Sequence, residues 1–124
     1  ELGRQVGLSA TAVIDRLHRL EDAGLIIGYR AELDREKLGL SVLAFVRLQT
    51  IPERYPALLA LVEAMPAVLE CHHVTGEESF VIKLVVATVA ELEPLIEQLS
   101  RFGRTSTSIV MSTPVGKRPL PLER

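Results

Sequence analysis

The order of hydrophobic patterns after residue 39 constrains the fold of this 124-residue chain more than any other feature of its sequence. Alternation typical of strands and three-to-four-residue spacing typical of helices follow one another as strand, helix, strand, strand, helix, strand. The six segments are residues 40–49, 57–65, 68–75, 79–86, 88–102 and 105–113. This βαββαβ order predicts a ferredoxin-like α+β domain with an antiparallel sheet.

Proline, glycine and threonine mark the ends of these segments. Pro66 stops the first helix, Gly103 stops the second, and the hydroxyl of Thr88 can cap the second helix at its start. Gly76 lies in a turn that joins the middle two strands into a hairpin. The tail beyond residue 113 carries three prolines, so we expect no regular structure there.

The predicted sheet has apolar side chains on both faces. Leu43 and Phe45 on the first strand, and Val81 and Val85 on the third, oppose the main apolar rows of those strands. Two helices cover one face of such a sheet, so we expect a second copy of the chain to cover the other. Burial of apolar surface, at roughly 25 cal/mol per Å², would favour this homodimer. The alternative is that Val81 and Val85 are scattered surface residues.

A second pattern, at residues 6–26, predicts a turn followed by an amphipathic helix. Gly7 suits the turn because glycine accepts a positive φ, Ser9 can cap the helix, and Gly24 can end it. The buried stripe of the helix is predicted to contain Val13, Leu17 and Leu20. These features predict the turn and second helix of a helix-turn-helix, and hence double-stranded DNA as a partner.

The polar surface of this helix carries the candidate DNA contacts. They are Ser9, Ala10, Thr11, Arg16 and Arg19. We expect the three residues at its N-terminus to approach base edges and the two arginines to contact phosphates. Two alternatives stay open: an ordinary amphipathic helix with a solvated polar face, and a surface ion pair of Arg16 with Glu21 or Asp22.

The overall charge is a mild objection to DNA binding. The formal net charge is −2, whereas contact with phosphates requires a basic surface. Only a local basic surface is needed, however. The first 30 residues offer one, because they contain Arg4, Arg16, Arg19 and Arg30.

Between the two patterns, residues 25–34 alternate and predict a strand with one buried face. Its apolar positions are Leu25, Ile27, Tyr29, Ala31 and Leu33. A charged turn and Gly39 then mark a change of pattern. We therefore expect a DNA-binding domain with its linking strand at residues 1–33, a linker at 34–39 and a second domain at 40–124.

The run GLSxxxVxxRLxRLExxGLIxGY, from Gly7 to Tyr29, resembles the DNA-reading half of the Lrp/AsnC family of transcription regulators. The resemblance implies a winged helix-turn-helix whose first helix precedes the matched run and is missing from this chain. It also implies that the linking strand pairs with its counterpart in a partner subunit and that the ferredoxin-like domain dimerises. Larger rings occur in the family, and one sequence does not decide between dimer, tetramer and octamer.

The predicted hairpin turn resembles the small-molecule loop of this family, which has the form TGxxDY or TGxxDF. The corresponding residues are Thr75, Gly76, Glu77, Glu78, Ser79 and Phe80. The resemblance implies an amino-acid effector bound between subunits, with backbone amides facing its carboxylate and acidic side chains facing its ammonium group. Ser79 replaces the usual aspartate, so a glutamate supplies the charge from a shifted position, or the ligand is not an ordinary α-amino acid. A plain turn without a ligand is the remaining alternative.

The triplet Cys71-His72-His73 is not expected to bind a metal or to act in catalysis. Adjacent strand residues point to opposite faces, and no second ligand pair follows at metal-site spacing. Cys71 therefore fits a small core residue. The chain also lacks the common nucleotide-binding and hydrolase motifs, so we expect neither an enzyme nor a cofactor.

The cellular setting follows from what the sequence lacks. Cys71 has no cysteine partner, no apolar run approaches the roughly 20 residues that span a bilayer, and no secretory signal is visible. The sequence predicts a cytoplasmic DNA-binding regulator that dimerises and senses an amino acid or related metabolite. The alternatives are a ferredoxin-like metabolite-binding module or small enzyme, and an architectural DNA-binding protein without an effector.

Overall fold

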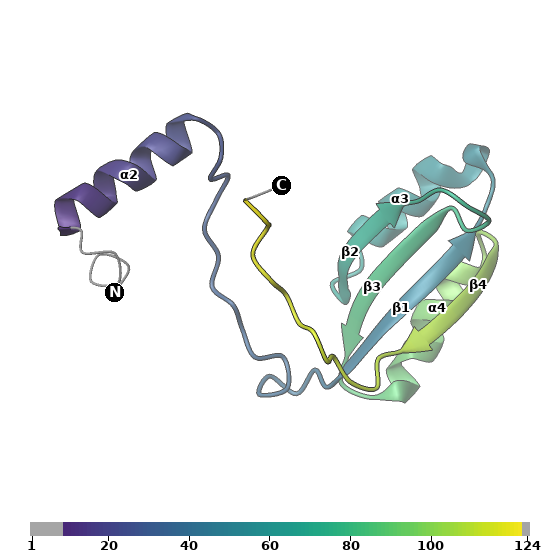
Figure 1. Cartoon of the computed structure of the whole chain (residues 1–124). Helices are drawn as coiled ribbons and strands as arrows, with labels where there is room; N and C mark the ends of the chain where they lie inside the picture. Colours follow the sequence, from purple (N-terminus) through teal and green to yellow (C-terminus); the bar gives the residue numbers. More distant parts are fainter. Residues whose placement is uncertain (1–8, 123–124) are drawn as a thin grey trace. The chain divides into compact units, whose positions relative to one another are not determined.

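The computed structural model describes residues 9–122, and the chain divides into two compact units between Leu33 and Asp34. The first unit contains helix α2 (Ala10–Asp22), and the second contains a four-stranded sheet with its helices (Figure 1). The predicted turn residue Gly7 and the basic residue Arg4 lie outside the described residues.

Helix α2 begins and ends as its sequence predicts. The Ser9 side chain accepts a hydrogen bond from the Ala12 backbone N–H at 3.1 Å, which satisfies one of the free donors at the start of the helix. Gly24 follows the last turn with a φ of 75°, a conformation in which a side chain would be strained. The Leu25 backbone N–H then reaches the Leu20 carbonyl at 2.9 Å and closes the helix with a Schellman motif.

The second unit has the predicted order of elements. They are β1 (Val42–Gln49), η1 (Pro52–Arg54), α3 (Tyr55–Glu63), β2 (Val68–His73), β3 (Phe80–Val86), η2 (Val89–Glu91), α4 (Leu92–Ser100) and β4 (Arg104–Ile109). The sheet has the strand order β2-β3-β1-β4, and every neighbouring pair is antiparallel. This arrangement confirms the ferredoxin-like prediction for this part of the chain.

The core lies between the sheet and its two helices, which Figure 1 shows on the same side of the sheet. Ala44, Val46 and Leu48 on β1 are fully buried, and their register partners on β3 belong to the same cluster. Leu58 from α3 and Leu99 from α4 complete this core. Their burial stabilises each by about 2 kcal/mol relative to exposure, and it is what holds the helices to the sheet.

The opposite side of the sheet, which we call the helix-free face, is partly apolar. Leu43, Phe45 and Val81 on this face are half-buried. Val85 is only 6% exposed, so the alternative that it is a scattered surface residue is wrong. Polar side chains share the face, since Arg47 and Lys83 alternate with these apolar residues along β1 and β3.

The predicted strand at residues 25–34 is not formed. Residues 27–33 make no backbone hydrogen bond to any described residue, and Ile27 is 98% exposed. Alternation of side chains suits one buried face, but a strand also needs a neighbouring backbone to pair with. Among the described residues, no backbone pairs with this segment.

Two smaller predictions are also wrong. The Thr88 side chain makes no capping hydrogen bond; instead, the Glu91 carboxylate accepts one from the Ala87 backbone N–H at 2.9 Å. The last strand ends at Ile109 rather than at residue 113. One further hydrogen bond joins the Val110 N–H to the Leu43 carbonyl at 2.8 Å, and β1 begins just before this point, at Val42.

The close contact between Gly103 and the end of β1 can be tested by mutation. A Cβ atom there would lie 1.9 Å from the Gln49 carbonyl oxygen, so no side chain fits without movement of backbone. We expect Gly103→Ala to lower the free energy of unfolding of the second unit by about 3 kcal/mol, measured by urea titration. Gly116→Ala is the control, because a Cβ atom there meets nothing within 4 Å. Equal stability of the two variants would contradict the packing described here.

Candidate nucleic-acid interface and effector loop

Helix α2 exposes all five of its predicted DNA contacts to solvent. They are Ser9, Ala10, Thr11, Arg16 and Arg19. At 100° per residue, Arg16 and Arg19 lie three positions apart on one flank of the helix. The apolar stripe of Val13, Leu17 and Leu20 is half-buried, so α2 has a less exposed apolar side and an exposed polar side.

The charges on α2 leave the two arginines available. Glu21 lies 3.5 Å from the Nδ1 atom of His18, so this carboxylate is paired within its own helix turn. Neither Arg16 nor Arg19 forms an ion pair with any residue in the range 9–122. The predicted alternative, in which Arg16 pairs with Glu21 or Asp22, is therefore not seen. Two guanidinium groups on one flank, without an ionic partner between residues 9 and 122, suit a row of phosphates.

The candidate effector loop is a tight hairpin turn between β2 and β3. The Val74 N–H donates to the Ser79 carbonyl at 2.9 Å, and Gly76 adopts a φ of 110° that favours glycine. Thr75, Gly76 and Glu77 are exposed at the tip of the turn. The turn therefore presents a hydroxyl, a backbone amide and a carboxylate to solvent.

Ser79 faces inward rather than toward the tip. It is only 8% exposed, and its hydroxyl donates to the Thr50 carbonyl at 3.0 Å while accepting from the Thr50 N–H at 3.2 Å. The Ser79 N–H also donates to the Leu48 carbonyl at 2.8 Å. The position at which the family motif has aspartate thus fastens the hairpin to the end of β1.

Phe80 and Glu78 are also engaged within the chain. Phe80 is 3% exposed, and its ring stacks on His73 and meets the edge of Tyr55, with centroids 4.9 Å apart in each pair. The Glu78 carboxylate lies 3.9 Å from the Nε atom of Arg47. Of the two candidate acids, Glu77 is therefore the one without a partner among the described residues.

Sequence reasoning missed the residues that hold this end of the domain together. The Thr50 hydroxyl donates to the Phe102 carbonyl at 2.5 Å, and the Arg54 guanidinium donates to the carbonyls of Arg101 and Phe102 at 3.2 and 3.3 Å. These contacts join the hairpin, the end of β1 and the end of α4. Their partners are 47 to 52 residues apart, so no local motif marks them.

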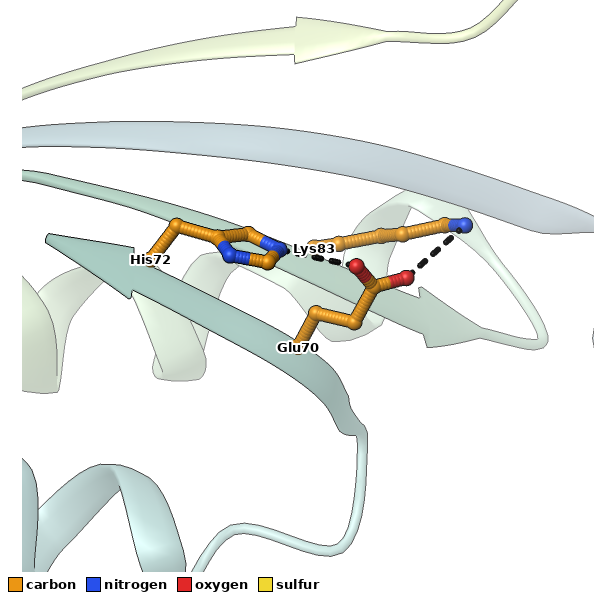
Figure 2. A network of polar contacts seen from close by, with 3 residues as sticks. All are labelled: Glu70, His72 and Lys83. Carbon is orange, nitrogen blue, oxygen red and sulfur yellow. Dashed lines mark hydrogen bonds and ion pairs between the residues drawn. The ribbon is translucent and has the colours of Figure 1, made fainter. Parts of the chain in front are cut away.

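The triplet Cys71-His72-His73 follows the predicted alternation. Cys71 is half-buried against the core, and burial raises the pKa of its thiol. His72 points to the helix-free face, where its Nε2 atom lies 2.8 Å from one oxygen of Glu70 while Lys83 donates to the other at 3.3 Å (Figure 2). These two hydrogen bonds lower the pKa of the Glu70 carboxyl. Within residues 9–122, no group of three or more candidate ligands could hold a metal ion.

Among the helices that the structure describes, none combines the length and the apolar character that crossing a bilayer requires.

Comparison with known sequences supports the resemblance drawn from the motifs. The family model described as the Lrp/AsnC ligand binding domain matches residues 43–120. The uncharacterized HTH-type transcriptional regulator YezC of Bacillus subtilis is 37% identical over 113 residues, which cover 91% of this chain and 80% of that protein. A leucine-responsive regulatory protein of Haemophilus influenzae is 34% identical over 118 residues, covering 90% of this chain and 71% of the relative.

A solved structure of a transcriptional regulator is also similar to this chain. A transcriptional regulator of Neisseria meningitidis in complex with L-methionine matches with a TM-score of 0.87 and 29% identity, over 98% of this chain and 83% of that one. The family match covers more than half of the chain, and the relatives above extend it through the N-terminal unit. The chain therefore belongs to the Lrp/AsnC family of transcription regulators.

Proposed function

We propose that this chain is a sequence-specific DNA-binding transcription regulator whose second unit senses an amino acid or a related small metabolite. The observation that carries the DNA-binding part is the exposed flank of α2, where Arg16 and Arg19 have no ionic partner among the described residues. A winged helix-turn-helix would place this helix in the major groove, with Ser9, Ala10 and Thr11 nearest the bases.

The proposed division of labour follows the two units. Residues 1–33 would contact DNA and end in the linking strand, residues 34–39 would form the linker, and residues 40–124 would bind the effector and the partner subunit. A second copy would supply the backbone that residues 27–33 lack, which is consistent with the exposure of Ile27. It would also cover the helix-free face, giving a homodimer that could assemble further.

For the effector, we propose a site at the tip of the β2–β3 turn. The N–H groups near Gly76 would bind a carboxylate, and Glu77 would bind an ammonium group. Ser79 and Phe80 would shape the loop from inside rather than touch the ligand. The L-methionine complex of the Neisseria meningitidis regulator makes an amino acid the first ligand class to test.

Effector binding and DNA binding would be thermodynamically coupled. An effector bound between second units would change their placement, hence the spacing of the two reading helices and the affinity for paired half-sites. Operator DNA must then change the effector affinity by the same factor.

A second function is favoured by one observation. Ser79 stands where the family motif usually has aspartate, and its hydroxyl is hydrogen-bonded to the Thr50 backbone, so this position supplies no carboxylate to the loop. An architectural DNA-binding protein that responds to no effector fits that feature. An enzyme or a metabolite-binding module without DNA binding has less support, because it has no use for the exposed arginine flank of α2.

The DNA-binding proposal predicts the effect of Arg19→Ala. Loss of one phosphate contact should weaken binding on all DNA sequences alike and reduce the slope of log K against log salt concentration by about 0.9. Fluorescence anisotropy on a specific and a random duplex at several salt concentrations measures both quantities. Arg101→Ala, an exposed arginine of the second unit, should change neither. A loss confined to one DNA sequence would refute the phosphate assignment.

The effector proposal predicts a selective thermal shift. Among the twenty amino acids, a ligand present at ~100 times its Kd should stabilise the protein by roughly 2.7 kcal/mol and raise Tm by several degrees. Glu77→Gln should abolish that shift, whereas Glu63→Gln, an exposed residue at the end of α3, should keep it. If no amino acid shifts the wild-type Tm, the effector-independent alternative is correct for this ligand class.

A further inference from the structure

The side chain of Arg47 joins the effector loop to the helix-free face. Arg47 lies on β1, and its register partners are Val81 on β3 and Ser106 on β4. Its Nη2 atom donates to the hydroxyls of Ser106 and Ser108, at 3.2 and 3.0 Å. Its Nε atom lies 3.9 Å from the carboxylate of Glu78, which belongs to the loop. One guanidinium group therefore contacts both the edge strand β4 and the loop between β2 and β3.

Glu78 supplies the charge that balances Arg47. The two serine hydroxyls are neutral, and no other carboxylate forms an ion pair with Arg47 in the part of the chain that the structure describes. Three other ionisable residues of this face are linked among themselves, because Glu70 contacts both His72 and Lys83 (Figure 2). Without the charge of Glu78, the guanidinium would keep neutral partners only.

This ion pair has little effect on stability while the face is open to water. The side chains of Arg47 and Glu78 are 34% and 44% exposed, and solvent screens pairs at such positions. A second copy that covers the face would remove water from Arg47, and a buried charge without an ionic partner is strongly unfavourable. The pair would then matter much more for association than for the folding of one chain.

We propose that the Arg47–Glu78 pair makes the strength of the subunit contact depend on the position of the effector loop. This inference rests on the proposed homodimer, in which the helix-free face is the contact. With Glu78 beside it, Arg47 enters the contact as half of a neutral pair. With Glu78 displaced, Arg47 enters as an uncompensated charge, and association weakens.

The two adjacent acids of the loop would have different roles. Glu77 is exposed and forms no ion pair among the described residues, so it is available to a ligand, whereas Glu78 lies beside the sheet. Because the two residues share a peptide bond, a ligand that displaces Glu77 would also displace Glu78 relative to Arg47. The pair would thus give the proposed coupling between effector and subunit arrangement a physical connection.

The test is a double-mutant cycle on self-association of the full chain, with the dimer Kd measured by fluorescence-detected sedimentation velocity. Glu78→Gln should weaken dimerisation by about tenfold. In the Arg47→Met background, Glu78→Gln should have no further effect, because no charge is left to balance. Glu63→Gln is the matched control, since this exposed residue at the end of α3 should leave the Kd unchanged.

The cycle separates this role from a structural role of Glu78 in the loop, which would weaken dimerisation equally in both backgrounds. Arg47→Lys keeps the charge and should restore the sensitivity to Glu78→Gln. A monomeric wild-type chain would overturn both this proposal and the homodimer. A dimer in which Glu78→Gln behaves like Glu63→Gln, or in which its effect persists beside Arg47→Met, would overturn this proposal alone. No ligand is added, so the result does not depend on which effector binds.

Discussion

The rest of the structure depends on one constraint: two helices cover only one face of the four-stranded sheet. Leu58 and Leu99 bring α3 and α4 onto the row that includes Ala44, Val46 and Leu48, and these residues are buried within a single chain. The helix-free face keeps Phe45 and Val81 half-exposed beside charged neighbours. Removing apolar surface from water is favourable by about 25 cal/mol per Å², so burial of the apolar residues of this face would favour association with another surface. The homodimer proposed above would follow from this uncovered face.

Most of the second unit could be predicted from the sequence, because hydrophobic periodicity and the residues that end helices act over a few neighbouring positions. Periodicity identified its four strands and two α-helices, though not η1 and η2. In the first unit, Ser9 and Gly24 marked the ends of α2 correctly because caps act within one helical turn. The strand predicted at 25–34 is not formed within the single chain for a physical reason: alternation reports which side chains can be buried, but a strand also needs a second backbone, and no described residue pairs with residues 27–33. Likewise, the length of β4 depended on where β1 begins.

The candidate loop shows the limit of motif reasoning more sharply. The motif located the turn and its positive-φ glycine, Gly76, but could not tell that Ser79 points inward. That orientation depends on Thr50, 29 residues away, whose backbone both donates to and accepts from the serine hydroxyl. Ser79, which is shorter than the aspartate of the family motif, is buried and helps to hold the turn in place. Glu77 is the exposed acidic residue at the tip of the turn. Through Thr50, the loop is also connected to Phe102, just beyond the end of α4.

The central claim, that the helix-free face is covered by a second copy, is tested most directly by sedimentation equilibrium of Val81→Lys. Val81 is half-buried on β3, an inner strand of the sheet, whereas Leu59 is exposed on α3 and provides the control Leu59→Lys. Wild type and the control should sediment as dimers or larger assemblies. Val81→Lys should weaken association by about 100-fold, because an unpaired charge would be buried, while circular dichroism remains that of the folded chain. A monomeric wild type, or a Val81 variant that associates as tightly as the control, would contradict the account.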